Sequence, residues 1–109
     1  MILTPEQAIK LAKLGYDEEC NQYYNTVTNS YQEFSSSATV KWPDTSDVLR
    51  WFRKKGYKYS IVPAVLSNVV YYEIYEHIGK TRCESWEEAE YKIMSELIQI
   101  EHDKLSNSV

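Results

Sequence analysis

Apolar residues recur at helical spacing in three segments of the chain, at residues 4–15, 44–56 and 85–102. The first segment opens with "TPEQ", a capping box with proline at the first helical position, and closes on a glycine. The second follows a proline and ends in "KKG", whose lysines complement the negative end of the helix dipole. The third opens with "SWEE", in which Ser85 caps and Glu88 follows three residues later. We therefore predict three helices, of which the last is the longest.

A different pattern fills the stretch between the second and third helices. Alternating apolar and aromatic residues predict two strands, at about Lys58–Val65 and Val69–Ile78, joined by a turn at Ser67–Asn68. Pro63 cannot donate a ladder hydrogen bond, which favours an edge position for the first of these strands.

The segment from residue 17 to residue 41 has the weakest pattern. "NQYYNTV" and "SATVKW" are two candidate short strands, with the Ser/Asn-rich "TNSYQEFSSS" as the loop between them. The resulting order is helix, strands, helix, hairpin, helix. It predicts an α+β fold, a small antiparallel sheet with about three helices packed mainly on one face.

The stretch "VVYYEIYEHIG" carries apolar or aromatic residues on both faces of the predicted strand, although a half-buried strand needs only one apolar face. We expect one face to lie against Trp86, Ile93 and Leu97 of the third helix. The other face has no covering layer from that helix, so it is a candidate protein-interaction surface. Its residues are Val69, Tyr71 and Tyr75, with Val62 from the neighbouring strand. The alternative is that the segment from 17 to 41, or the first helix, covers this face.

The length of 109 residues fits a single domain, residues 1–109, with 1–3 and 106–109 as frayed termini. The net charge of -4 disfavours nucleic acid and anionic membrane as partners of the whole molecule. The start "MILTPEQ" lacks the features of a signal peptide, and no stretch approaches the ~20 apolar residues that cross a bilayer. Cys20 and Cys83 show no disulfide framework, which suits a reducing compartment. We expect a cytoplasmic protein with no membrane partner.

A short basic segment supports an alternative function. Aromatic residues alternate with basic ones between residues 41 and 59, and this mixture is typical of surfaces that bind single-stranded nucleic acid. The opposing interpretation is a solvated helix face whose rings point inward. The candidate residues for nucleic-acid binding are Arg50, Arg53, Lys54, Lys55 and Lys58.

Metal binding and catalysis have little support in the sequence. Cysteine and histidine are donors that zinc prefers, but no pair of them has the spacing of a zinc site, so we expect no metal and no cofactor. A minor alternative is a small hydrolase-like enzyme in which His77 serves Cys20 or Cys83. Glycine-rich phosphate loops and nucleophile elbows are missing, so we assign no catalytic residue.

The order of "LTPEQAIKLAKLGYDE", "WPDTSDVLRWFRKKGYKYSIVP", "YYEIYE" and "SWEEAEYKIMSELIQI" resembles small proteins encoded in phages and prophages of Bacteroidetes. The resemblance rests on capping and core positions: Leu14, Gly15, Tyr16, Val48, Trp51, Phe52, Arg53, Glu87, Glu88 and Ala89. It implies a shared fold and a bacterial host cytoplasm, and it implies no activity, cofactor or catalytic residue. Together with the uncovered sheet face, it predicts a non-enzymatic protein-binding or assembly module, whose partner is another protein or a second copy.

Overall fold

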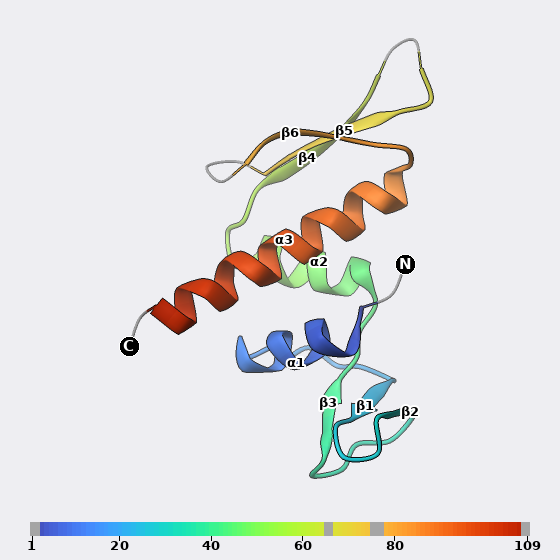
Figure 1. Cartoon of the computed structure of the whole chain (residues 1–109), viewed down its shortest axis with the longest axis vertical. Helices are drawn as coiled ribbons and strands as arrows, with labels where there is room; N and C mark the ends of the chain where they lie inside the picture. Colours follow the sequence, from blue (N-terminus) through green and yellow to red (C-terminus); the bar gives the residue numbers. More distant parts are fainter. Residues whose placement is uncertain (1–2, 65–66, 75–77, 108–109) are drawn as a thin grey trace. The chain divides into compact units, whose positions relative to one another are not determined.

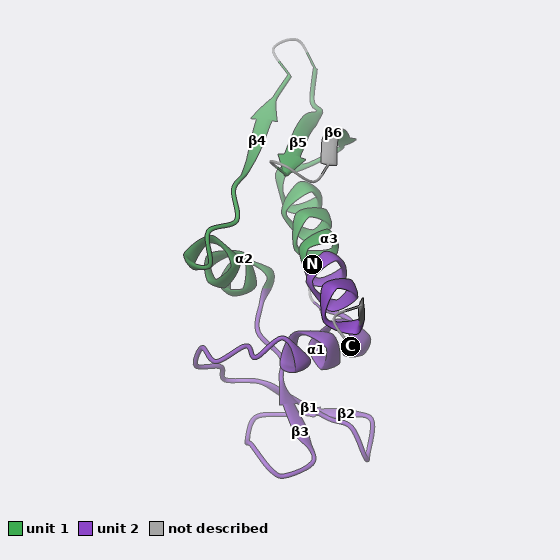
Figure 2. Ribbon diagram, turned by 90° about the vertical axis from the view of Figure 1, so that its left-hand side faces the viewer, with its two compact units in different colours: residues 1, 45–97 green, residues 2–44, 98–109 purple. Residues whose placement is uncertain are grey.

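The chain forms two compact units in a computed structural model that describes residues 3–64, 67–74 and 78–107. The first unit comprises residues 1 and 45–97, and the second comprises residues 2–44 and 98–109 (Figure 2). Each unit contains its own three-stranded sheet. The single domain expected from the length stays a prediction.

The fold class is α+β, as predicted, with helices packed on antiparallel sheets (Figure 1). The strands form two sheets, whereas the sequence pattern predicts one. The elements in chain order are α1 (Pro5–Lys13), β1 (Tyr23–Asn25), β2 (Ser30–Gln32), β3 (Thr39–Lys41), α2 (Thr45–Lys54), β4 (Tyr59–Pro63), β5 (Val70–Ile74), β6 (Ile78–Cys83) and α3 (Trp86–Asn107).

The sheet of the second unit has the order β2-β1-β3, and both pairings are antiparallel. Tyr24 of the central strand lies opposite Tyr31 on one side and Val40 on the other. The Ser/Asn-rich pattern predicts a loop at Tyr31, and this prediction is wrong because Ser30–Gln32 pairs with β1. The indole Nε1 of Trp42, just after β3, donates to the Leu3 carbonyl at 2.9 Å and so ties the start of the chain to this unit.

Helix α1 begins and ends as its sequence predicts. Thr4 Oγ1 accepts the Gln7 amide at 3.2 Å, while Gln7 Oε1 accepts the Thr4 amide at 2.9 Å, which completes the capping box. At the other end Gly15 has a φ of 88°, and the Tyr16 amide donates to the Leu11 carbonyl at 3.3 Å. A glycine in this conformation is the usual way to end a helix, because it adopts positive φ without a steric cost.

The sheet of the first unit has the order β4-β5-β6 and is antiparallel throughout. Its inner face, which is the side that carries Val70, Tyr72 and Ile74, is buried. Helix α3 lies along this side of the sheet and contributes the buried Ile93 and Leu97 (Figure 1). Both residues are buried, as the expected covering role requires, whereas Trp86 at the first turn of α3 is 50% exposed.

The predicted hairpin is correct for β4 and β5 and wrong beyond them. The second strand ends at Ile74 instead of continuing to Ile78, which begins β6. Strand β6 has the sequence "IGKTRC" and was missed, because glycine and charged residues weaken the alternation that marks a strand. The register between β5 and β6 shifts between Tyr72 and Ile74.

Strand β4 lies at the edge of its sheet, as Pro63 predicts. Just past the strand the Ala64 amide donates to the Val69 carbonyl at 3.0 Å. Hydrogen-bonded and non-hydrogen-bonded pairs alternate along an antiparallel ladder, so the backbone groups of Tyr59, Ile61 and Pro63 point away from β5. The missing amide of Pro63 therefore breaks no bond within the sheet.

Helix α3 starts at its predicted cap and continues beyond its predicted end. Ser85 Oγ accepts the Glu88 amide at 3.1 Å, and the Glu88 carboxylate accepts the Glu84 amide at 2.9 Å. The helix extends to Asn107, so residues 106 and 107, expected to fray, are helical, and Leu3 at the other end is buried. No helix within the described ranges is both long and apolar enough to span a bilayer.

Candidate functional site

The candidate site is the outer face of the β4-β5-β6 sheet, which we define by Ser60, Val62, Tyr71, Glu73 and Arg82. Strand register places Val62 opposite Tyr71, Ser60 opposite Glu73, and Arg82 of β6 opposite Tyr71. Directly opposed residues share a face of a sheet, so these five side chains lie on the side away from Tyr72. Val62 is 55% exposed and Tyr71 is 37% exposed. The outer face thus presents an aliphatic and an aromatic side chain as neighbours on adjacent strands.

The four residues predicted for this surface have different outcomes. The exposure expected for Val62 and Tyr71 is confirmed. The exposure expected for Val69 is wrong: this residue precedes β5, its carbonyl closes the end of the hairpin, and only 8% of its surface is exposed. Tyr75 lies outside the described residues.

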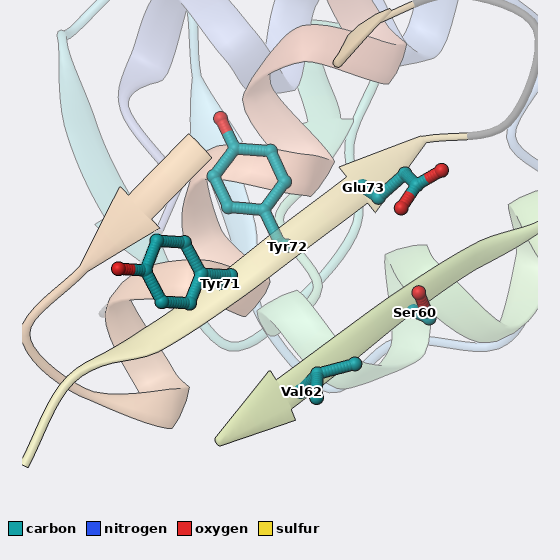
Figure 3. Close-up of a pocket in the computed structure, with 5 residues that line it drawn as sticks. All are labelled: Ser60, Val62, Tyr71, Tyr72 and Glu73. Atoms are coloured by element: carbon teal, nitrogen blue, oxygen red, sulfur yellow. The ribbon is translucent and has the colours of Figure 1, made fainter. Parts of the chain in front are cut away.

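A shallow hollow of about 150 Å³ lies on the outer face between β4 and β5. Ser60, Val62, Tyr71, Tyr72 and Glu73 line it, and Figure 3 shows Val62 and Tyr71 on neighbouring strands, with Ser60 and Glu73 as the next pair along. The hollow has room for one aliphatic side chain of a partner, and Glu73 is the charged residue among those that line it. Its size and composition suit an apolar contact in a larger interface.

The inner face anchors the strand that carries Tyr71. The Tyr72 hydroxyl donates to Glu96 Oε1 of α3 at 2.8 Å. Burial, followed by this hydrogen bond, raises the pKa of Tyr72 to about 12, so the phenol stays protonated and keeps donating at neutral pH. Glu96 Oε2 is buried and has no hydrogen-bond partner among the described residues. Tyr72 therefore fixes β5 against α3, and the alternation of the strand directs Tyr71 outward.

The basic residues proposed for nucleic-acid binding are at the surface, but several of them contact neighbouring side chains of the protein. The Arg50 guanidinium pairs with the Asp47 carboxylate on the same helix. Arg53 lies over the Tyr59 ring, with its guanidinium carbon 4.7 Å from the ring centroid. Such contacts hold cations over aromatic rings within the protein instead of leaving both available to bases.

The rings of the same segment have the inward position that the opposing interpretation requires. Trp51 and Phe52 are buried, and the Lys55 ammonium lies 4.4 Å from the centroid of the Trp51 ring. Lys54 and Lys58 are exposed. Buried rings cannot stack on nucleobases, so this segment lacks the stacking platform that single-stranded nucleic acid requires. Nucleic-acid binding stays a prediction for the exposed charges alone.

The cysteines give little support to the enzyme alternative. Cys83 lies on the inner face and is buried, and its burial raises the pKa of the thiol above its usual value, although Lys92 opposes this effect. A raised pKa reduces the thiolate population and hence the nucleophilicity at neutral pH. The Cys20 thiol donates to the Gln22 carbonyl at 2.9 Å. His77 lies outside the described residues, and across the described ranges His, Cys, Asp and Glu form no group of three or more suited to a metal ion.

An aromatic cluster in the second unit was not found from the sequence. The Tyr31 ring stacks on Trp42 with centroids 3.5 Å apart and an interplanar angle of 16°, and Tyr24 lies 5.4 Å from Tyr31. Phe34 and Val27, which flank β2, are exposed. The cluster depends on the register of β2, which places Tyr31 beside the central strand, and no local pattern in the sequence marks that register.

No protein-family model, no curated protein and no solved structure matches this chain.

Proposed function

We propose that this chain is a non-enzymatic protein-binding or assembly module whose contact surface is the outer face of the β4-β5-β6 sheet. The observation that carries the proposal is the exposed pair of Val62 and Tyr71, which borders a hollow large enough for one side chain. Tyrosine is enriched in the cores of protein interfaces because it offers a large rigid surface with a polar tip.

The surroundings of this pair also suit a protein partner. Glu73 and Arg82 place opposite charges on the same face, with Ser60 as a small polar neighbour. An apolar centre with a polar rim is the usual anatomy of an interface. The opposite face is occupied by α3, and the hydrogen bond from Tyr72 to Glu96 keeps the sheet in place when the outer face is covered.

The test is affinity capture with three baits: wild type, Tyr71→Lys and Trp86→Lys. Trp86 is a matched control, because it is an exposed aromatic residue of the same unit that lies on α3 and not on the outer face. The resemblance to phage-encoded proteins makes a lysate of a prophage-carrying bacterium the first choice, with an untagged copy of this chain added to report self-association.

The proposal predicts a defined protein, identified by mass spectrometry, that wild type and Trp86→Lys retain and Tyr71→Lys loses. If Tyr71→Lys retains the same proteins as wild type, the outer face is not the contact surface and the proposal fails. A parallel capture after nuclease treatment tests the alternative at Arg50–Lys58. Capture that nuclease abolishes, and that weakens steeply with salt, would favour nucleic-acid binding.

A further inference from the structure

The outward edge of β4 carries backbone groups that no strand of its own sheet pairs. The register places the amide and carbonyl groups of Tyr59 and Ile61 on the side away from β5, as the bond from Ala64 to Val69 requires. Edge strands with unpaired groups are templates for a further strand, and proteins commonly protect them with charged side chains or proline. Strand β4 carries no charged residue, and its one proline, Pro63, lies at its last position. No charge or proline within Tyr59–Val62 therefore blocks pairing along the first part of the edge.

We infer that β4 pairs antiparallel with β4 of a second copy, about a two-fold axis at Ser60, so that the two sheets join into one. In this register Tyr59 lies opposite Ile61 of the partner subunit, and Ile61 lies opposite Tyr59 of the partner subunit. Both are hydrogen-bonded pairs, so every outward amide and carbonyl of these two residues finds a partner. Two-fold symmetry repeats each bond, as an isologous interface requires.

Pro63 selects this register over its neighbour. If the axis lay at Ile61, Pro63 would face Tyr59 of the partner subunit and could not supply the amide that the Tyr59 carbonyl needs. With the axis at Ser60, Pro63 falls outside the paired stretch. The proline that limits pairing at one end of the edge thus directs it to the Tyr59–Ile61 end.

The side chains of the edge are compatible with a second copy. Tyr59 and Ile61 are half-buried on the inner face, where they would lie opposite each other across the axis, with the Arg53 guanidinium over the Tyr59 ring of each copy. Residues 45–97 carry equal numbers of basic and acidic residues, so the net charge of -4 comes from the rest of the chain and not from the unit that contains the edge. The short paired stretch gives a small interface, and we therefore expect a weak, reversible dimer.

This inference rests on the proposed assembly function of the same sheet, and it uses the edge of the sheet instead of the outer face. Ser60 belongs to both surfaces, whereas Tyr71 lies on β5 and takes no part in the edge pairing, so a variant at Tyr71 tests the outer face alone.

A charge exchange at Ser60 tests the register. The variants Ser60→Lys and Ser60→Glu change only a side chain, so the ladder between β4 and β5 keeps its backbone bonds. Like charges would face each other across the axis in each variant alone, and opposite charges would do so in the mixture. Sedimentation equilibrium gives the dissociation constants, and native mass spectrometry with one chain isotopically labelled identifies the heterodimer. Circular dichroism checks that each variant folds.

The expected result is a wild-type dimer, a loss of at least about tenfold in affinity for each variant alone, and recovery of dimer in the mixture. Hydrogen exchange gives a second measurement on the unaltered protein, where the Tyr59 and Ile61 amides should gain protection as concentration rises. A wild type that stays monomeric up to about 1 mM would overturn the inference.

The inference and the proposed function fail in different ways. A dimer that Tyr71→Lys disrupts, and that the mixed Ser60 variants do not recover, would overturn the edge pairing and leave the outer face as the contact surface. A wild type that stays monomeric but captures another protein through Tyr71 would likewise overturn the edge pairing and leave the outer face as the contact surface. If mixing the two Ser60 variants recovers no dimer, and Tyr71→Lys captures the same proteins as wild type, then both the edge pairing and the proposed function are refuted.

Discussion

We expect the hydrogen bond from Tyr72 to Glu96 to contribute more to the stability of the first unit than any other single polar contact there. The substitution Tyr72→Phe removes only the hydroxyl and keeps the buried ring. Because the Tyr72 hydroxyl donates to Glu96 Oε1 at 2.8 Å, and Oε2 is buried without a partner among the described residues, the variant leaves this carboxylate poorly satisfied. A hydrogen bond to a charged group contributes about 1.5–3 kcal/mol, so we expect the free energy of unfolding to fall by about 2 kcal/mol.

The assay is urea unfolding at neutral pH, followed by circular dichroism, with Tyr71→Phe as the matched control. Tyr71 directly precedes Tyr72 in β5, and its side chain lies on the outer face. The same chemical change there should alter the free energy of unfolding by no more than about 0.5 kcal/mol.

A double-mutant cycle with Glu96→Leu separates the pair from its surroundings. If the two groups interact, Tyr72→Phe should lower the free energy of unfolding much less in the Glu96→Leu background than in wild type. The coupling free energy should be about 1 kcal/mol or more. Equal effects of Tyr72→Phe and Tyr71→Phe, or a coupling near zero, would show that this contact does not fix β5 against α3.

Three further predictions concern alkaline pH and the helix ends. The pKa of Tyr72 rises from about 10 in the unfolded chain to about 12 in the folded protein, so its contribution to stability should be complete below pH 10 and lost as pH rises toward 12. Urea unfolding of wild type and Tyr72→Phe across this range tests it, because the difference between the two proteins should shrink; a constant difference would contradict the assignment. Gly56 has a φ of 100°, so Gly56→Ala should lower the free energy of unfolding by about 1 kcal/mol although the added methyl meets no atom within 4 Å; a neutral effect in urea unfolding would show that positive φ is not required there. Thr4→Ala should cost about 1 kcal/mol in the same assay through loss of the α1 cap, and Thr4→Ser should recover most of it.

Local signals in the sequence predicted the helices and the edge strand correctly. The capping boxes, the prolines and the C-terminal glycines act within a few residues, so they can be read without knowledge of the fold. The alternation of side-chain directions along a strand also predicts that Tyr72 lies on the opposite face from Val62 and Tyr71. Successive strand residues point to opposite faces wherever the strand lies in the fold.

The elements that were missed depend on pairing between distant residues. Strand β2 is only three residues long and lies in a Ser/Asn-rich segment, and its strand character comes from pairing with β1. Strand β6 contains glycine and charged residues and is completed by β5. Val69 was placed on the exposed face by extending the alternation of β5 one residue too far, into the hairpin connection. The stack of Tyr31 on Trp42 could not be predicted for the same reason, since it follows from the register of β2.

The proposed role of the outer face of the β4-β5-β6 sheet in protein binding can be tested by measuring the affinity of one defined partner for three forms of the chain. Isothermal titration calorimetry would compare wild type, Tyr71→Lys and Trp86→Lys, or dimer dissociation would do so if the partner is a second copy. Central aromatic residues of an interface typically contribute 2 kcal/mol or more, so Tyr71→Lys should weaken binding at least about thirtyfold. Trp86→Lys should stay within about threefold of wild type. Equal affinities for Tyr71→Lys and wild type, with both proteins folded, would show that the outer face is not the binding surface.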